Sequence, residues 1–191
     1  YVTFEINPDV GGTWFEHRYP GVGVDTPSHF YSYSFEITPE WTHYHPRGVD
    51  MQKYLLHVAD KYDLRRNIRF NTEVVALHYD DADAVWNVTV RGKDGEEEVI
   101  RANAVINAHG PVNRWKWPDI PGREDFQGKV MHTATWDPST RIEGKRVGIP
   151  EWAQTAGIYA RGFLAETAGV DLRKIRWVQA GKNEAGREEK V

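Results

Sequence analysis

The spacing of apolar residues changes from a helical period to a strand period near residue 66. Apolar positions three and four residues apart predict an amphipathic helix over about residues 50–66, capped by Asp50. Residues 68–106 instead alternate apolar with polar or small side chains, which predicts a β-meander with a turn at residues 92–95. The apolar face of the predicted helix consists of Met51, Tyr54, Leu55, Val58, Ala59 and Tyr62.

Shorter patterns border these elements. Residues 1–5 have the pattern of a strand already under way, so we expect the chain to begin within a fold and to be a fragment. Residues 7–35 are rich in glycine, proline and serine, which predicts an ordered loop region of the kind that often holds ligands. Residues 104–108 predict a short buried strand that ends at Gly110.

The last part of the chain contains shorter segments with the helical period and with the strand period. Residues 144–149 predict a new strand, residues 156–164 a second helical face, and residues 175–178 a further strand. The order of elements along the whole chain predicts an α/β fold.

Composition favours a soluble globular protein, with 40% apolar residues, 27% charged residues and a net charge of -4. No apolar run approaches the roughly 18 residues of a membrane helix, and no segment is typical of a signal peptide, so we expect a cytoplasmic protein without a membrane partner. The absence of cysteine excludes disulfides, thiolate metal sites and cysteine nucleophiles. Acidic residues slightly outnumber basic ones, so the charge distribution does not indicate a nucleic-acid-binding surface.

His43 and His45 stand two residues apart, a spacing that suggests a metal site as one hypothesis. Two imidazoles on one strand face can bind zinc, but no third ligand follows at a fixed spacing. Surface or capping histidines are the preferred interpretation, and we predict no metal.

The residues around the opening strand point to a nucleotide instead. Glu5 ends that strand, where dinucleotide-binding folds place an acid that accepts hydrogen bonds from ribose hydroxyls. Taken alone, Glu5 is more typical of a solvated strand end. Gly11 and Gly12 follow closely, however, and paired glycines let the backbone approach a ligand.

Several motifs in one order resemble the Baeyer–Villiger monooxygenases and related flavin-containing monooxygenases over about residues 1–147. Near the start, the resemblance is carried by residues 4–5, 10–14, 18–21, 25 and 31–35. Further on, Phe126-x-Gly128-x-x-x-His132-x-x-x-Trp136-Asp137 fits the fingerprint of that family, and its Trp-Asp ending resembles the Baeyer–Villiger branch.

The resemblance implies a partial FAD-binding, Rossmann-like domain over residues 1–118, as in flavoproteins with two dinucleotide-binding domains. Residues 119–147 would be the fingerprint linker toward an NADPH domain. The residues implied to bind FAD are Glu5, Gly11, Gly12, Thr13, Trp14, Asp25, Tyr31, Val74, Ala108 and Gly110.

Two residues are the catalytic candidates that the resemblance implies. Asp25 would sit beside the isoalloxazine, and His132 would couple the motion of the FAD and NADPH domains without acting as a general base. In this family NADPH reduces FAD, and a flavin C4a-peroxide formed with O2 inserts one oxygen atom into a ketone. The implied partners are therefore a small ketone and O2.

The chain departs from the family pattern at both phosphate loops. The first GxGxxG of the family would stand before Tyr1, outside this sequence, and residues 148–152 stand where the second would follow residues 144–147. A glycine-rich loop at a helix N-terminus cradles the pyrophosphate, so we expect weak FAD binding and no activity from this chain alone.

Residues 148–191 resemble instead the dihydroxyphthalate decarboxylase and periplasmic-binding-protein-like group, which predicts a short foreign α/β tail. Two alternatives to a monooxygenase fragment follow. The chain is a small-molecule-binding or decarboxylase-like module defined by that tail, or it is a non-functional chimera with a junction near residues 145–148.

Overall fold

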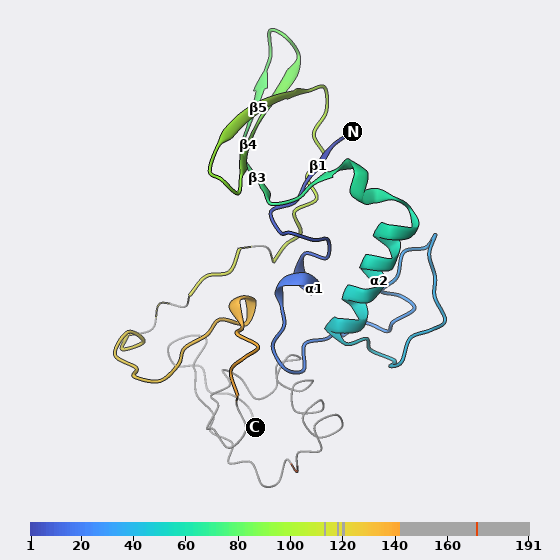
Figure 1. Cartoon of the computed structure of the whole chain (residues 1–191), viewed down its shortest axis with the longest axis vertical. Coiled ribbons are helices and arrows are strands. Elements are labelled where there is room, and N and C mark those ends of the chain that lie inside the picture. Colours follow the sequence, from blue (N-terminus) through green and yellow to red (C-terminus); the bar gives the residue numbers. More distant parts are fainter. Residues whose placement is uncertain (113, 118, 120, 142–170, 172–191) are drawn as a thin grey trace, which may run out of the picture. The chain divides into compact units, whose positions relative to one another are not determined.

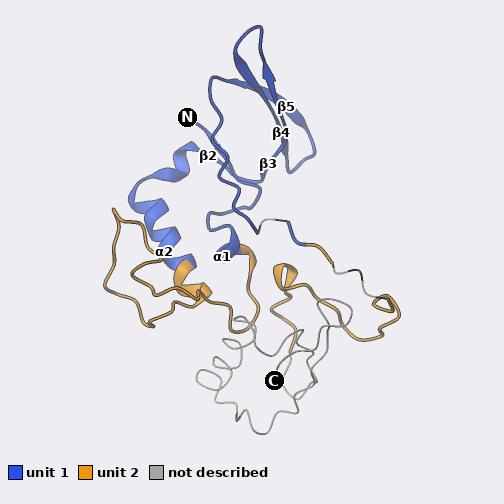
Figure 2. Ribbon diagram, turned by 180° about the vertical axis from the view of Figure 1, so that it is seen from behind, with its two compact units in different colours: residues 1–15, 52–115 blue, residues 16–51, 116–191 orange. Residues whose placement is uncertain are grey.

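The computed structural model describes residues 1–112, 114–117, 119, 121–141 and 171. The chain divides into two compact units, drawn in blue and orange in Figure 2. Unit 1 comprises residues 1–15 and 52–115, and unit 2 comprises residues 16–51 and 116–191. The strand, helix and strand predicted after residue 143 lie outside the described residues.

The main helix, α2 (Gly48–Lys61), begins earlier and ends sooner than the predicted 50–66. Asp50 is not its N-cap. It lies in the first turn and accepts a hydrogen bond from Arg47 (Nε to Oδ2, 2.9 Å), while the Arg47 carbonyl accepts from the backbone of Asp50 (2.9 Å). The helix stops because Asp63 adopts a left-handed conformation with φ 50°. A short 3-10 helix, η1 (Leu64–Asn67), follows.

The apolar face of α2 is buried much as the periodicity predicts. Met51, Tyr54, Val58 and Ala59 are at most 6% exposed. Tyr62 is 42% exposed because it lies beyond the last helical residue.

The opening strand forms as predicted but is short. β1 (Thr3–Phe4) pairs in parallel with β2 (Ile68–Arg69), with Thr3 opposite Ile68. The pairing continues past β1, since the Glu5 amide donates to the Arg69 carbonyl (3.1 Å) and the Thr72 amide to the Glu5 carbonyl (2.9 Å).

The meander is confirmed within narrower bounds, and it is the green sheet of Figure 1. It consists of β3 (Thr72–Asp80), β4 (Val85–Gly92) and β5 (Glu97–Ala102), joined in antiparallel order. Val88 and Val90 of the central strand are its buried hydrophobic residues, at 5% and 1% exposure. The β4–β5 turn closes where predicted, with the Gly95 amide bonded to the Gly92 carbonyl (3.0 Å) and φ 86° at Gly95.

The bounds 68–106 predicted for the meander were wrong at both ends. Residues 68–69 belong to the parallel pair with β1, because their partner is the opening strand rather than β3. Residues 104–108 form no strand, and Ile106 is 92% exposed. Among the described residues no strand lies beside this segment, and an extended segment needs a neighbour to take its backbone hydrogen bonds.

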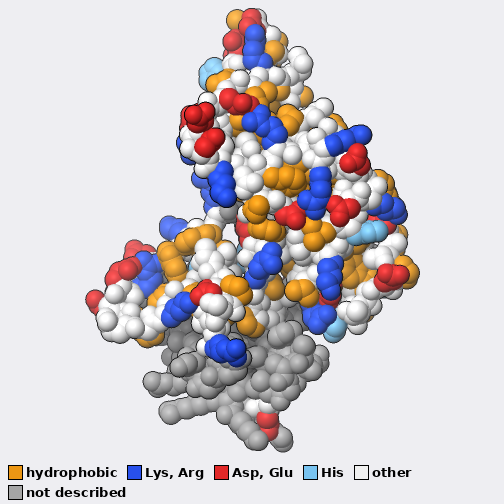
Figure 3. Space-filling model, in the orientation of Figure 1, with side chains coloured by type: hydrophobic (Ala, Val, Ile, Leu, Met, Phe, Trp, Pro, Cys, Tyr) orange, Lys and Arg blue, Asp and Glu red, His pale blue; other side chains and the backbone are white. Residues whose placement is uncertain are grey.

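The surface of the meander carries both signs of charge. Figure 3 shows Lys and Arg side chains interspersed with Asp and Glu on the face that it draws. Arg91 is paired with Glu97 (2.7 Å), and Arg101 with Asp83 (2.5 Å). Such exposed pairs contribute little stability individually.

Unit 2 is built around irregular segments. An isolated antiparallel bridge joins Gly23 to Arg47, and Val24 is buried. Within residues 121–141 the regular element is the 3-10 helix η2 (Thr133–Thr135). No helix in the parts of the chain that the structure describes has the length and apolar content needed to cross a membrane.

Candidate functional site

The glycine loop, residues 7–12, carries the chain from β1 into the short helix α1 (Thr13–Glu16). Gly11 and Gly12 have φ values of 130° and 50°, which turn the backbone in a way that favours glycine. Their carbonyls accept hydrogen bonds from the amides of Trp14 and Phe15, both at 3.0 Å. The two predicted glycines therefore set the geometry that presents Thr13 and Trp14, both half-buried.

Glu5 and Asn71 hold the start of this loop. The Asn7 amide donates to Glu5 Oε1 (2.8 Å), and the Asn7 carbonyl accepts from the Asn71 amide (3.1 Å). Glu5 is half-buried, so it is more than a solvated strand end. One of its carboxylate oxygens orders the glycine loop.

Arg65 of η1 holds the middle of the loop. Its guanidinium donates to Asp9 Oδ1 through Nη1 and to Asp60 Oδ1 through Nε, each at 2.7 Å. Asp9 Oδ1 also accepts from the Val10 amide (2.7 Å). The hydrogen bonds to Asp60 and then to Asp9 raise the pKa of Arg65 above its ordinary value. A fixed positive charge thus links the loop to the C-terminal end of α2.

Gln52 of α2 holds the end of the loop. Its Nε2 donates to the Val10 carbonyl (2.8 Å), a contact across 42 residues of sequence. Its Oε1 is buried and has no hydrogen-bond partner among the described residues, and a Cβ built on Gly11 would lie 2.0 Å from that oxygen. Gln52 therefore occupies the space where any other residue at position 11 would place its side chain.

Sequence reasoning missed both Gln52 and Arg65. The helical period assigns Gln52 to the polar face of α2, and nothing in the spacing of Arg65 connects it to Asp9. Their contacts depend on how the chain brings distant segments together, and no local pattern encodes that.

The other predicted FAD residues of unit 1 lie outside the glycine loop. Val74 is on β3, opposite Val90 and next to a register shift between Val74 and Ala76, and it is 37% exposed. Ala108 and Gly110 are exposed, and no hydrogen bond among the described residues ties either to the loop. The structure thus brings Glu5 and residues 11–14 together and leaves residues 108 and 110 apart from them in hydrogen bonding.

Asp25 and Tyr31 belong to unit 2. Asp25 is exposed, and Tyr31 is 41% exposed. The Tyr31 amide donates to the carbonyls of Pro27 (3.1 Å) and Ser28 (3.2 Å), which forms a tight turn.

Ser28, which sequence reasoning also missed, is the buried anchor of that turn at 1% exposure. Its backbone amide donates to the Tyr44 carbonyl (2.8 Å), and its hydroxyl lies 2.6 Å from the His43 carbonyl. Ser28 thereby closes residues 28–44 into a loop whose neck is fixed.

His132 of the fingerprint is half-buried and caps η2. Its Nδ1 accepts a hydrogen bond from the Ala134 amide (3.1 Å), so a neutral ring carries its proton on Nε2. The ring meets Trp117 edge to face, with centroids 5.6 Å apart. Arg123 lies over the same Trp117 ring, 5.0 Å from its centroid.

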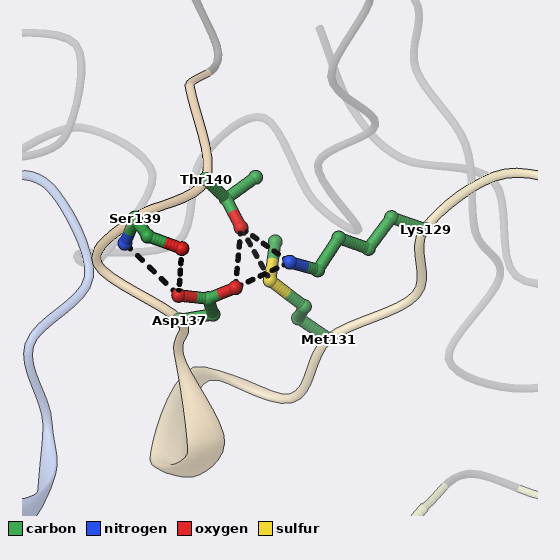
Figure 4. A network of polar contacts seen from close by, with 5 residues as sticks. All are labelled: Lys129, Met131, Asp137, Ser139 and Thr140. Carbon is green, nitrogen blue, oxygen red and sulfur yellow. Dashed lines mark hydrogen bonds and ion pairs between the residues drawn. The ribbon is translucent and has the colours of Figure 1, made fainter.

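Asp137, the last fingerprint residue, is the centre of the polar network in Figure 4. Its Oδ2 accepts from Lys129 Nζ (2.5 Å) and Thr140 Oγ1 (3.1 Å), and its Oδ1 accepts from the amide (2.9 Å) and hydroxyl (2.6 Å) of Ser139. The bond from Lys129, followed by those from Ser139, lowers the pKa of Asp137 far below its ordinary value of 3.8. The carboxylate therefore stays charged and closes the fingerprint segment into a loop.

His43 and His45 do not belong to a metal-binding cluster in the described part of the chain. Within the described residues no group of three or more histidine, aspartate or glutamate side chains is arranged to hold a metal ion. A shallow cavity of about 290 Å³ lies beside Ile6, Asn71 and Lys93, and none of the predicted cofactor residues lines it.

A glycine loop thus follows β1 and Glu5, and the fingerprint segment is closed by Asp137. The chain belongs to the flavin-binding monooxygenase-like family, whose model matches residues 2–182. This family assignment confirms the resemblance found in the sequence.

Curated relatives agree with the family. A Baeyer-Villiger monooxygenase from Streptomyces coelicolor is 41% identical over 150 residues, which is 78% of this chain and 28% of the relative. The FAD-binding monooxygenase tazF from Aspergillus terreus is 39% identical over 146 residues, covering 76% of this chain and 26% of the relative. A Baeyer-Villiger monooxygenase from Pseudomonas aeruginosa is 37% identical over 180 residues, covering 93% of this chain and 33% of the relative.

Solved structures agree as well. A cyclohexanone monooxygenase bound to ε-caprolactone matches with a TM-score of 0.75 and 36% identity, over 86% of this chain and 32% of that one. OTEMO in complex with FAD and NADP matches with a TM-score of 0.74 and 35% identity, over 87% of this chain and 32% of that one. The α/β, Rossmann-like fold class is thereby confirmed. The chain spans about a quarter to a third of the relatives it matches.

Proposed function

We propose that this chain supplies the glycine-loop half of an FAD site and the fingerprint of an NADPH-dependent Baeyer–Villiger-type monooxygenase. The overall reaction is ketone + O2 + NADPH + H⁺ to ester + H2O + NADP⁺, so one oxygen atom enters the substrate and the other leaves as water. The observation that carries the proposal is the glycine loop, because it is ordered by contacts from Glu5, Arg65 and Gln52.

The residues of this loop fit a flavin nucleotide. A Cβ built on Gly12 would meet nothing within 4 Å, so open space borders the backbone where a ligand would approach. Glu5 uses Oε1 for the Asn7 amide, and its carboxylate offers a second oxygen for a ribose hydroxyl. When bound, FAD would supply the hydride and oxygen chemistry, and the protein would supply binding and orientation.

Each remaining candidate has a defined part in this proposal. Gly11, Gly12, Thr13 and Trp14 line the pyrophosphate and flavin, and Val74 meets the adenine through its backbone. Asp25 and Tyr31 stand beside the isoalloxazine, and Ala108 and Gly110 complete the cofactor contacts. His132, with Nδ1 occupied by the Ala134 amide, transmits motion between domains rather than abstracting a proton. The proposed setting is the cytoplasm.

The proposal also covers the tail. The family match extends to residue 182, and the Pseudomonas relative aligns over 180 residues, which favours one family along the chain over a foreign segment at 148–191. Sequencing the source locus across codons 140–155 tests this directly. A reading frame that changes when resequenced would identify the tail as an assembly error.

The test of function uses the protein that contains this chain, expressed from its complete reading frame. We expect it to bind FAD and to oxidise NADPH when cyclohexanone is added, with ε-caprolactone identified by mass spectrometry. Because Gln at position 5 keeps an acceptor for the Asn7 amide but loses the second acceptor, Glu5→Gln should weaken FAD binding about tenfold. Glu40→Gln, at an exposed position, is the matched control. A parent protein that binds no flavin, or a Glu5→Gln variant that binds it normally, contradicts the proposal.

A further inference from the structure

We propose that Gln52 is a positioning residue, whose function is to fix the Val10–Gly11 peptide and thereby the glycine loop that receives the flavin. The inference rests on the proposed function for the identity of the ligand. The contact itself stands on the geometry of Gln52, Val10 and Gly11 alone.

The first step is that stability does not explain a glutamine at this position. Its Nε2 makes a good hydrogen bond to the Val10 carbonyl (2.8 Å), but within the described part of the chain its Oε1 is buried with no partner. A hydrogen bond gains less than the burial of an unsatisfied oxygen loses. An apolar side chain of similar size would fill the same space without that loss, and buried polar atoms left unpaired call for a functional reason.

The second step is that the contact acts on the loop at its critical point. Gly11 has φ 130°, and its carbonyl accepts a hydrogen bond from the amide of Trp14, in the first turn of α1. Gln52 donates a hydrogen bond to the carbonyl of the Val10–Gly11 peptide. Its side chain also fills the space beside the Gly11 Cα. The orientation of the Gly11 carbonyl, and with it the start of α1, therefore depends on Gln52.

The third step is that the other loop contacts cannot replace this one. Glu5 and Asn71 hold Asn7, and Arg65 holds Asp9. Asp9 Oδ1 also accepts from the Val10 amide, so these contacts hold the chain up to the Asp9–Val10 peptide. They leave the next peptide, Val10–Gly11, to Gln52.

The experiment compares Gln52→Met with Lys53→Met in the complete protein. Methionine fills a similar volume without hydrogen bonding, and Lys53 is exposed on the same turn of α2. Two quantities are measured for each variant: hydrogen exchange of the Trp14 and Phe15 amides without FAD, and the dissociation constant of FAD. The unfolding midpoint is recorded alongside.

For Gln52→Met we expect an unfolding midpoint within about 4 °C of the parent. Exchange at Trp14 and Phe15 should rise about tenfold, and FAD binding should weaken about five- to tenfold. Lys53→Met should change none of these. Rescue of slow exchange by Gln52→Glu is not expected, because a carboxylate cannot donate to the Val10 carbonyl.

The outcomes separate the two hypotheses. If the parent binds no FAD but Gln52→Met still speeds exchange at Trp14 and Phe15, the proposed function fails and the positioning of the loop stands. If exchange is unchanged, the inference about Gln52 is overturned whatever FAD does. A large fall of the midpoint with faster exchange throughout unit 1 also overturns it, since Gln52 would then be a general packing residue.

Discussion

The glycine loop and the fingerprint both carry the family resemblance in sequence, yet they are held in place in different ways. Residues 7–12 are fixed by partners 42 and 56 residues away, namely Gln52 on Val10 and Arg65 on Asp9. The end of the fingerprint is fixed by near neighbours, since Lys129, Ser139 and Thr140 all lie close in sequence to Asp137.

The difference teaches where each motif gets its shape. A loop held by distant side chains has its geometry only when the surrounding fold is complete. A segment held by near neighbours can close by itself, at the cost of contacts that are exposed and screened by solvent. Mutations at the first should therefore be costly and act at a distance, whereas mutations at the second should be mild and local.

Gly11→Ala should have the largest effect on the free energy of unfolding. Alanine is strained at φ 130°, and its Cβ would lie 2.0 Å from Gln52 Oε1, so the Gln52 side chain must move. We expect a loss of roughly 2–4 kcal/mol in the free energy of unfolding, measured by urea denaturation. Gly12→Ala is the control: it has open space around it and φ 50°, and should lose only about 1 kcal/mol. Equal losses at both positions would refute the argument from Gln52.

Ser28→Ala tests whether a distant contact is equally costly in unit 2. Removing the hydroxyl of the buried Ser28 leaves the His43 carbonyl without its 2.6 Å partner. The expected loss is about 1–3 kcal/mol in the free energy of unfolding. Ser34→Ala, an exposed serine of the same loop, should change it by less than about 0.5 kcal/mol. A neutral Ser28→Ala would mean that the neck of the loop is held by the backbone bond alone.

Arg65→Met should have a smaller effect than either change above. It removes the ion pairs with Asp9 and Asp60, but Arg65 is 36% exposed in its side chain and solvent screens the charges. We expect a loss of about 0.5–1 kcal/mol at low salt, which shrinks as salt is added. Arg66→Met removes a more exposed pair, with Asp63 at 3.3 Å, and serves as the control. Unfolding measured at two salt concentrations distinguishes the two arginines.

Asp137→Asn should have the smallest effect. Asparagine still accepts the Ser139 amide but loses the charge that pairs with Lys129. We expect proteolysis within residues 126–141 to speed up about two- to threefold, with the rest of the chain unaffected. Thr133→Val, at an exposed position in the same segment, is the control.

The parent protein should show a matching pH dependence. The folded state lowers the pKa of Asp137. The carboxylate's contribution to the stability of the fingerprint loop is therefore fully present above the ordinary pKa of 3.8 and is lost as the pH falls below that value. Proteolysis of the fingerprint should therefore be constant from neutral pH down to about pH 5. Faster cleavage already at pH 6 would contradict the account of Asp137.

Sequence patterns predicted the elements whose causes are local. The apolar period located the buried face of α2, and alternation located β3, β4 and β5, because Val88 and Val90 point to the same buried side. The end of α2 was missed because it depends on Asp63 adopting φ 50°, a conformation that aspartate tolerates but rarely signals. Residues 104–108 were misassigned because an apolar run shows what a segment prefers and not whether a partner strand is available.

Within the site, motifs identified the residues whose chemistry is distinctive, such as Glu5 and the paired glycines. The residues that hold them, Gln52, Arg65 and Ser28, are ordinary in type and spacing. They act because folding brings them to a particular backbone atom, and only the three-dimensional structure reveals that.

The parallel pairing of β1 with β2 has a consequence for the order of folding. It joins Thr3 to Ile68, so the intervening chain must be looped and ordered before the two strands can meet. The meander joins only neighbouring hairpins over residues 72–102, and such local pairings form faster. The N-terminal strand should thus dock last, after β2 and the meander strand β3 have provided a surface for it. The glycine loop follows that strand directly in the chain, so it would acquire its shape in the same late step.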